Sequence, residues 1–433
     1  MTPQSNFMVI APLVSDKTSA LRTLLASMNR QPGVVDPQNS LVAFGEFDRL
    51  HFARFIVFDD QTLNDIAVYG LPRPNLPTYL AFLGDCDGPA DEFLAELTQR
   101  AGSGLRQIFS HCEGFAANGD LLRWMQDNQQ RAAAAYVNWI GRTVRQVREE
   151  NALRNALTAY LDGNRTAIAA KNPVQIRDDL TRFVNGQVEA GRLTLTPPAP
   201  TPLGWKVRNF FHLVGVPVVL LLLAPLLLLY LPIFLVQLRC RERSDPEICP
   251  PPDPEHVKKL ADLEDHDVTN QFSALGSVKP GLFRRWTVSF LVWILDYGSR
   301  HIFNRGFLTR VNSIHFARWV FLDNKKRLFF ASNYDGSLES YMDDFINKVA
   351  WGLNLVFSNG VGYPRSNWLV LNGAKDEQKF KHFIRRHELP TEVWYNAHPG
   401  LTAVDLERNR KIRQGIEKPF TTEAEIQEWL RLF

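Results

Sequence analysis

The feature that most constrains the fold is a stretch of sequence that occurs twice. LHFARFIVFDD, residues 50–60, and IHFARWVFLDN, residues 314–324, share the run HFAR and a similar alternation of side chains. β-Branched and aromatic residues are frequent in both copies, which predicts a strand in each. More than half of the 433-residue chain separates them. The repetition therefore predicts two structural units of the same kind rather than one.

The repetition extends well beyond this strand. In the first half the residue pattern predicts strands at 6–13, 50–58, 79–85 and 134–140, and helices at 15–29, 89–109 and 120–128. The corresponding segments of the second half are 270–280, 283–303, 314–323, 327–336 and 337–357. Near the end of each half, Gly141 and Thr143 stand opposite Gly400 and Thr402. The sequence thus predicts an α+β fold made of two βαββαβ units in tandem.

A βαββαβ unit has helices on one face of its sheet, so the other face needs a cover. The sheet of the twin unit can provide it. In this arrangement the chain resembles the dimeric α/β-barrel superfamily of ferredoxin-like domains, over about residues 5–165 and 268–417. The resemblance implies two ferredoxin-like plaits packed sheet to sheet. We expect a first plait with a C-terminal helix at 1–190, Pro-rich linkers around an inserted segment at 191–265, and a second plait at 266–433.

The inserted segment is LVGVPVVLLLLAPLLLLYLPIFLVQL, residues 213–238, which is apolar apart from Gln237. As a helix rising about 1.5 Å per residue, it is long enough for a hydrocarbon layer of about 30 Å. We therefore expect a membrane segment, with the lipid bilayer as a partner. A helix buried in the core is a poor alternative, because a plait offers nothing that would cover such a run on all sides.

Two topologies are open for this segment. A straight crossing would put the two plaits on opposite sides of the membrane, where they could not pair. A hairpin bent near Pro225 would enter and leave one leaflet and keep the plaits together. Basic residues flank both ends: Lys206 and Arg208 before, Arg239, Arg241 and Arg243 after. By the positive-inside rule, this pattern places the soluble parts in the cytoplasm and favours the hairpin.

Composition excludes some other classes of function. A net charge of +3 without a basic stripe predicts that nucleic acid is not a partner. The four cysteines have neither CxxC spacing nor the density of a disulfide framework, which indicates reducing surroundings. Histidine and cysteine are not clustered at zinc spacing, and the motifs of P-loop, serine-hydrolase and dinucleotide sites are missing from the sequence. The identity of any metal and the oligomeric state stay open.

The strongest local motif is GDCDG, residues 84–88. It resembles the GxxDG motif of dye-decolourising peroxidases, which are haem enzymes built from tandem plaits. The resemblance implies that Asp87 acts on peroxide together with an arginine, for which Arg54 is the candidate, and that a histidine of the second plait ligates the iron. His315 and His398 are the candidates, although neither matches the family by a motif. The alternative is a structural one, because Asp-Gly after a strand is also typical of a turn with a helix cap.

The HFAR strands suggest a second site. Period-two alternation places Arg54 with Phe52 and Ile56 on one face of the strand, and His51 with Ala53 on the other. A small residue suits the face covered by helices, so Arg54 and Arg318 should face the space between the sheets. Two guanidinium groups there could bind a carboxylate, a phosphate or a haem propionate. Alternatively, each arginine pairs with an internal carboxylate or with carbonyl groups at strand ends.

Together these patterns predict a membrane-attached protein that binds a hydrophobic or anionic small molecule. A haem-dependent, peroxidase-like oxidoreductase is the specific hypothesis, with Asp87 and Arg54 as catalytic residues and Arg318, His315 and His398 as haem-binding residues. The competing class is a non-enzymatic lipid-binding or scaffold protein in which the space between the sheets is simply a packed core.

Overall fold

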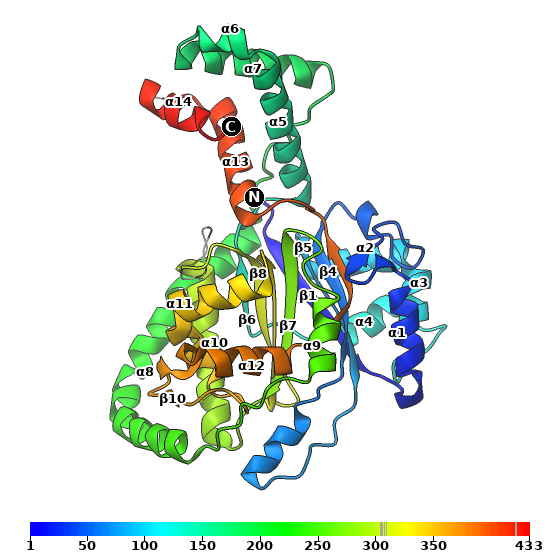
Figure 1. The fold of residues 1–433 in the computed structure, drawn as a ribbon, viewed down its shortest axis with the longest axis vertical. Helices are drawn as coiled ribbons and strands as arrows, with labels where there is room; N and C mark the ends of the chain where they lie inside the picture. The colour runs from blue at the N-terminus through cyan, green and yellow to red at the C-terminus, as the bar shows by residue number, and fades with distance from the viewer. Residues whose placement is uncertain (304–305, 307, 309, 421) are drawn as a thin grey trace.

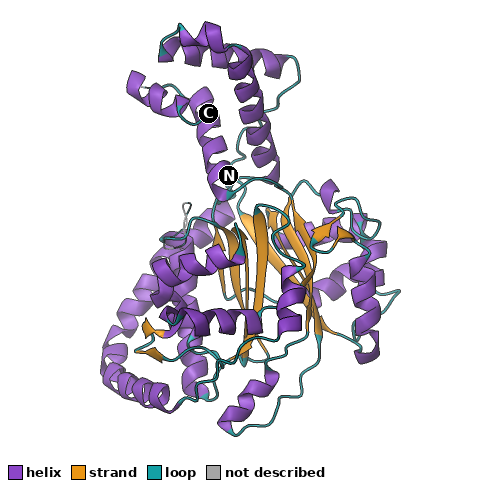
Figure 2. Ribbon diagram, in the orientation of Figure 1, coloured by secondary structure: helices purple, strands orange, loops and turns teal. Residues whose placement is uncertain are grey.

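Two four-stranded antiparallel sheets form the centre of the molecule (Figures 1 and 2). The computed structural model describes residues 1–303, 306, 308, 310–420 and 422–433. In spatial order, the first sheet consists of β1 (Gln4–Pro12), β5 (Tyr79–Asp87), β4 (Leu50–Phe58) and β12 (Thr391–Asn396). The second sheet consists of β6 (Ala134–Val137), β8 (Ile314–Leu322), β9 (Arg327–Asp335) and β7 (Thr269–Ser277). The predicted α+β class is confirmed.

The last strand of each half belongs to the sheet of the other half. β6 pairs with β8, where Tyr136 lies opposite Ala317, and β12 pairs with β4, where Tyr395 lies opposite Ala53. The expectation that residues 134–140 complete the first sheet is therefore wrong. β4 and β8 are the two HFAR strands, and each receives the exchanged strand along the same edge. The two halves are linked by this exchange as well as by their facing sheets.

The sheets pack face to face through an apolar layer. It contains Met8, Ile56, Phe58, Ala81 and Leu83 of the first sheet and Leu275, Val320, Leu322, Phe329 and Ala331 of the second. On the opposite face of the first sheet, Ala53, Phe55 and Val57 pack against helices, as strand alternation predicts. Each sheet thus has one face against helices and one face against its neighbour.

Helices cover the outer face of each sheet (Figure 1). On the first sheet they are α1 (Thr18–Ala26), α2 (Ala90–Arg100), α3 (Gly102–Phe109) and α4 (Leu121–Asp127). Around the second sheet are α9 (Pro254–Ala261), α10 (Leu282–His301), α11 (Leu338–Phe357) and α12 (Glu377–His387). Small elements complete the connections: the hairpins β2 (Asn29–Gln31) with β3 (Val34–Val35) and β10 (Ser366–Asn367) with β11 (Leu371–Asn372), and the 3₁₀ turns Ser15–Lys17, Phe44–Glu46, Leu63–Tyr69 and Gly373–Lys375.

The helix predicted at 89–109 is interrupted, and the interruption is repeated. Ala101 has φ −122° and ψ 19° and separates α2 from α3. In the second half, Val349 has φ −140° and ψ 22° inside α11. These residues occupy the same position when Phe93 is aligned with Tyr341. The two halves therefore share a local backbone irregularity that the sequence pattern does not predict.

A helical arm projects from one end of the sheets (Figure 1). It combines α5 (Val144–Gly163), α6 (Arg165–Ala169) and α7 (Pro173–Glu189) of the first half with α13 (Ala403–Glu417) and α14 (Glu423–Leu430) of the second. Leu153, Leu157 and Leu180 share one apolar cluster with Ile412 and Trp429. Both halves thus contribute helices to a single arm.

The apolar segment lies within one long helix, α8 (Leu203–Ser244). Figure 1 shows α8 as a curved helix along the outer side of the second half. The helix continues through Pro217, Pro225 and Pro232, so the expected hairpin turn near Pro225 is replaced by a curve. Among the described residues, α8 is the one helix long and apolar enough to cross a membrane by length and composition. None of its most apolar stretch of 18 residues is buried.

Candidate functional site

Two histidine–aspartate pairs, one from each half, lie where the sheets meet. Nε2 of His51 is 3.0 Å from Oδ1 of Asp87, and Nε2 of His315 contacts Oδ1 of Asp335. Both imidazole rings are fully buried. The pairs join two repeated motifs, because each histidine comes from an HFAR strand and each aspartate precedes the glycine of a DG turn. The sequence singled out three of these side chains, but it did not bring them together as pairs.

A β-bulge in each HFAR strand accounts for the position of the histidine. The register of β4 with β5 shifts between Leu50 and Phe52, and that of β8 with β9 shifts between Ile314 and Phe316. A bulge inserts an extra residue and turns its side chain away from strict alternation. As a result, the ring of His51 lies 5.5 Å from the ring of Phe316 on the opposite sheet. The expectation that His51 shares the helix-covered face with Ala53 is therefore wrong.

Each aspartate also accepts a hydrogen bond from the first turn of a helix in the arm. Val144 N, at the start of α5, donates to Oδ2 of Asp87 at 2.8 Å. Ala403 N, at the start of α13, donates to Oδ2 of Asp335 at 2.7 Å. A helix N-terminus favours an anion, because its backbone N–H groups are unpaired and its dipole is positive there. The structural alternative for Asp87 thus holds in a modified form, since it caps α5 and not the helix that directly follows the turn.

The third side chain of each unit differs between the halves. His398 Nε2 is 3.0 Å from Nδ1 of His51, whereas the Trp139 ring meets the ring of His315 edge-on at 4.9 Å. Trp139 and His398 occupy equivalent positions, two residues before Gly141 and Gly400. Burial, followed by the neighbouring His51, lowers the pKa of His398 well below its usual value. His398 is therefore neutral at neutral pH.

Arg54 and Arg318 face the space between the sheets, as the alternation predicts. Arg54 donates to Phe272 O at 2.9 Å and to the side chain of Asn333. Arg318 donates to Phe7 O at 2.8 Å and forms an ion pair with Asp85. Each arginine thus crosses to the opposite sheet and bonds there to a strand. Internal carbonyl oxygens accept hydrogen bonds from both guanidinium groups, and a carboxylate pairs with Arg318, which is the structural alternative stated above.

The charges between the sheets are not balanced. Asp85 and Asn333 occupy equivalent positions on β5 and β9, so only Arg318 has a carboxylate as its direct partner. Burial, with a further contribution from the nearby Arg318, lowers the pKa of Arg54 to about 9. At neutral pH Arg54 keeps its charge among neutral acceptors, including the hydroxyl group of Ser273 at 2.9 Å.

The residues predicted to hold haem do not fit it. By the resemblance, Asp87 would act on peroxide and a histidine would ligate the iron, so a haem would have to fit between these side chains. Here Asp87 and His398 bond to the two nitrogens of one ring, that of His51, which leaves no room for a haem plane between them. His315 is bound to Asp335 and covered by Trp139. Neither His315 nor His398 lines either of the two cavities described below.

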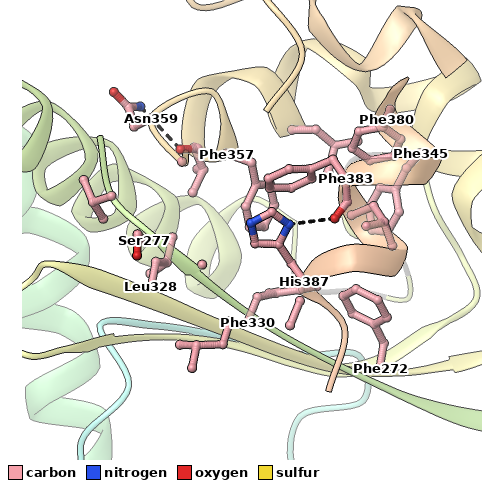
Figure 3. Close-up of a pocket in the computed structure, with 18 of the residues that line it drawn as sticks. Phe272, Ser277, Leu328, Phe330, Phe345, Phe357, Asn359, Phe380, Phe383 and His387 are labelled. Carbon is pink, nitrogen blue, oxygen red and sulfur yellow. Dashed lines mark hydrogen bonds between the residues drawn. The ribbon is translucent and has the colours of Figure 1, made fainter. Parts of the chain in front are cut away.

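A small apolar cavity lies between the second sheet and its helices (Figure 3). Its volume is about 50 Å³, and its walls include Phe272, Phe330 and Phe383. His387 lies at the wall, where its Nδ1 is 2.8 Å from Phe383 O and its Nε2 has no partner among the described residues. Burial lowers the pKa of His387, so the ring is neutral there. The cavity is too small for haem or an acyl chain, and we interpret it as a packing defect.

A second cavity is a large cleft of about 1660 Å³ beside β6. Its walls include the start of β1, the start of α5, one side of α13 and the first turns of α8. Trp139 lines this cleft, as does Ala403, whose N–H group is bonded to Asp335. The His315–Asp335 pair therefore lies directly behind one wall of the cleft.

Sequence reasoning missed Asp335, Trp139 and the cleft. Asp335 was visible as the aspartate of the second DG turn, and Trp139 could have been found by aligning Gly141 with Gly400 and comparing the residues two positions earlier. The cleft had no sequence signal, because its walls come from segments far apart in the chain. Comparisons of this chain with models of protein families, with curated protein sequences and with solved structures found no match.

Proposed function

We propose that this protein attaches to a membrane through α8 and binds a hydrophobic or anionic small molecule at the bilayer surface. The observation that carries the proposal is the exposure of α8. Leu221, Leu222 and Leu229 are each more than 70% exposed in the middle of the helix. An apolar surface of this extent is unfavourable in water, and α8 is long enough to enter a hydrocarbon layer.

Both ends of α8 contact the same helix, α10. Near its start, His212 Nδ1 lies 2.8 Å from His301 Nε2, at the end of α10. Near its end, Arg241 stacks over the ring of Phe283, at the start of α10, and Asp245 forms an ion pair with Arg284 at 2.5 Å. The two helices therefore run antiparallel, with both ends of α8 held on one body.

The lengths of the two helices explain the curve of α8. At about 1.5 Å per residue, the stretch from His212 to Arg241 is roughly 44 Å long, whereas all of α10 is roughly 30 Å. The longer helix must bow outward between its two contacts, as Figure 1 shows. We propose that this bow enters one leaflet and that α8 does not cross the bilayer. The basic residues at both ends then lie among lipid headgroups on the cytoplasmic side.

We further propose that the two halves are tandem ferredoxin-like plaits that arose by duplication and have exchanged their last strands. Support comes from the matched strand orders, the matched bulges at His51 and His315, and the matched helix interruption at Ala101 and Val349. In this arrangement the interior between the sheets is a packed core, so a ligand site lies outside it.

Membrane attachment is tested by flotation of the full-length protein with phosphatidylcholine vesicles. We expect the protein to float, and a variant with Leu221, Leu222 and Leu229 replaced by Ser to stay in the dense fraction. A matched control replaces exposed apolar residues elsewhere, Leu71 and Val174, with Ser and should float. Equal flotation of the α8 variant and the control would contradict the proposal.

The topology is tested by cysteine labelling in intact cells. Single cysteines replace Ala199 and Pro252 in a variant that lacks the native cysteines. Both should be protected from a membrane-impermeant thiol reagent and react after lysis. Labelling of one position from outside, with protection of the other, would mean that α8 crosses the membrane.

The peroxidase-like hypothesis has an independent test. We expect protein purified from haem-supplemented cells to lack a Soret band. Asp87 and His398 are both bonded to the ring of His51, and His315 is paired with Asp335, so none of them is free to hold a haem. A Soret band that disappears in both the Asp87→Ala and the His315→Ala variants would support haem binding instead.

A further inference from the structure

The cleft beside β6 has the composition of a site for an amphiphilic molecule. Tyr136, Val137 and Trp139 contribute apolar surface to its wall. Eight arginine and lysine side chains line it, against five aspartate and glutamate side chains. The lining is thus both apolar and net positive. A volume of about 1660 Å³ is more than enough for a single acyl chain with a small head group.

Most of the basic side chains in the wall already have acidic partners. Arg142 pairs with Glu150 at 2.5 Å, and Arg410 pairs with Glu407 at 2.5 Å. Arg208 and Arg131 are different, because neither forms an ion pair or side-chain hydrogen bond with any residue that the structure describes. Both are exposed cations in the wall of the cleft, and Arg208 is the one that belongs to the first turns of α8.

The wall also contains two buried donors that lack acceptors. Nε1 of Trp139 and the hydroxyl group of Tyr136 have no hydrogen-bond partner within the described part of the chain. Their side chains are 6% and 1% exposed. A buried donor without an acceptor costs about 1–3 kcal/mol, and such groups are rare in folded proteins.

The cleft opens beside the part of α8 that precedes its exposed apolar stretch. Trp205, Arg208 and Leu213 all belong to both the wall of the cleft and the first turns of α8. In the orientation proposed above, these turns lie at the level of the lipid headgroups. A molecule that leaves the leaflet there would reach the cleft without crossing bulk water.

We infer that the cleft binds a single-chain amphiphile with an anionic head group, taken up from the adjacent leaflet. Arg208 contacts the carboxylate or phosphate group at the mouth of the cleft, and the acyl chain lies along the apolar wall at Trp139. This inference rests on the proposed membrane attachment, because the bilayer is the source of the ligand. Binding itself can be measured apart from the membrane.

The experiment uses Trp139 and Trp205 as reporters in the full-length protein in detergent. Bromine quenches tryptophan fluorescence on contact, so brominated stearate should give saturable quenching. Brominated lysophosphatidic acid tests whether a phosphate head group binds as well, and the brominated methyl ester of stearate tests the need for charge. We expect the ester to bind roughly tenfold more weakly or worse, since it lacks the charge that Arg208 would pair with.

Matched variants locate the site. Arg208→Gln should weaken stearate binding roughly tenfold, whereas Arg123→Gln, an exposed arginine on α4, should have no effect. Trp139→Phe should reduce the quenched amplitude. If Trp139→Phe does not fold, the same reduction is expected in Trp205→Phe, which removes the second reporter. Equal quenching by stearate and its ester, or quenching that persists without both tryptophans, would overturn the inference. Flotation of a protein that shows no quenching would reject the cleft and leave the membrane proposal intact.

Discussion

The two histidine–aspartate units are alike in two of their three side chains and differ in the third. In both units an aspartate joins the imidazole ring of an HFAR strand to the first turn of an arm helix. The third position is His398 in one unit and Trp139 in the other. What the units share fixes the arm to the sheets, so it has a structural role. The third side chain is not needed for this attachment, because it differs between the units. Of the two residues at that position, Trp139 lines the large cleft and His398 does not.

The arginines between the sheets show the same kind of partial symmetry. Arg54 and Arg318 cross to opposite sheets through the same bonds to the backbone, but Asn333 replaces the carboxylate of Asp85. A single carboxylate thus serves two buried guanidinium groups. The equivalent geometry of the two halves therefore accommodates a buried guanidinium group with a direct carboxylate partner in one case and without one in the other.

The largest effect is expected when this single carboxylate is removed. Asp85→Leu leaves both buried guanidinium groups without a counter-charge and should lower the free energy of unfolding by about 3–5 kcal/mol. Asn333→Leu removes only a neutral acceptor and should cost about 1–3 kcal/mol. Chemical denaturation of both variants in detergent measures the difference. Equal losses would show that charge does not distinguish the two sites.

The shared part of the histidine–aspartate units predicts nearly equal effects. Asp87→Ala and Asp335→Ala each remove an acceptor that bonds a histidine and a helix N-terminus, so each should cost about 2–3 kcal/mol. The same denaturation assay applies, with Asp87→Asn and Asp335→Asn as milder controls. If Asp335→Ala proved harmless and Asp87→Ala did not, the two units would not be structural equivalents.

The third position predicts a pH dependence in one unit. The pKa of His398 is lowered in the folded protein, whereas in the unfolded chain it returns to about 6.5. The unfolded chain therefore takes up the proton first as the pH falls. The contribution of His398 is complete above pH 6.5 and is lost progressively below it. We expect the Tm to fall less between neutral and acidic pH in His398→Gln than in the wild type. Trp139→Phe should keep the wild-type slope, and identical slopes in His398→Gln and wild type would contradict the assignment.

The smallest effect is expected beside the apolar cavity. Gly276 stands where the first half has Ala11, and a Cβ atom at Gly276 would lie 3.0 Å from Cδ2 of His387. Because that ring borders a cavity of about 50 Å³, it can move to make room. Gly276→Ala should change the free energy of unfolding by less than about 1 kcal/mol. A loss of several kcal/mol would show that His387 is held rigidly.

Some of the fold could be predicted because it depends on local pattern. β4 has the predicted bounds, Leu50–Phe58, and its alternation correctly placed Arg54 between the sheets. The strand exchange could not be predicted, because β4 and β8 are near copies and offer an incoming strand almost the same edge. The same limit applies to His51, since a bulge reverses the face that period-two alternation assigns.

The strand exchange has a consequence for how the chain is made. During synthesis β4 emerges early, but its neighbour β12 lies close to the C-terminus, so the edge of the first sheet stays open until the ribosome has nearly finished. β6 likewise waits for β8 until α8 has emerged. A chaperone or the membrane itself would have to shield these edges in the meantime. Fragments split within the linker before α8 should be insoluble when expressed singly and should recover by complementation when expressed together.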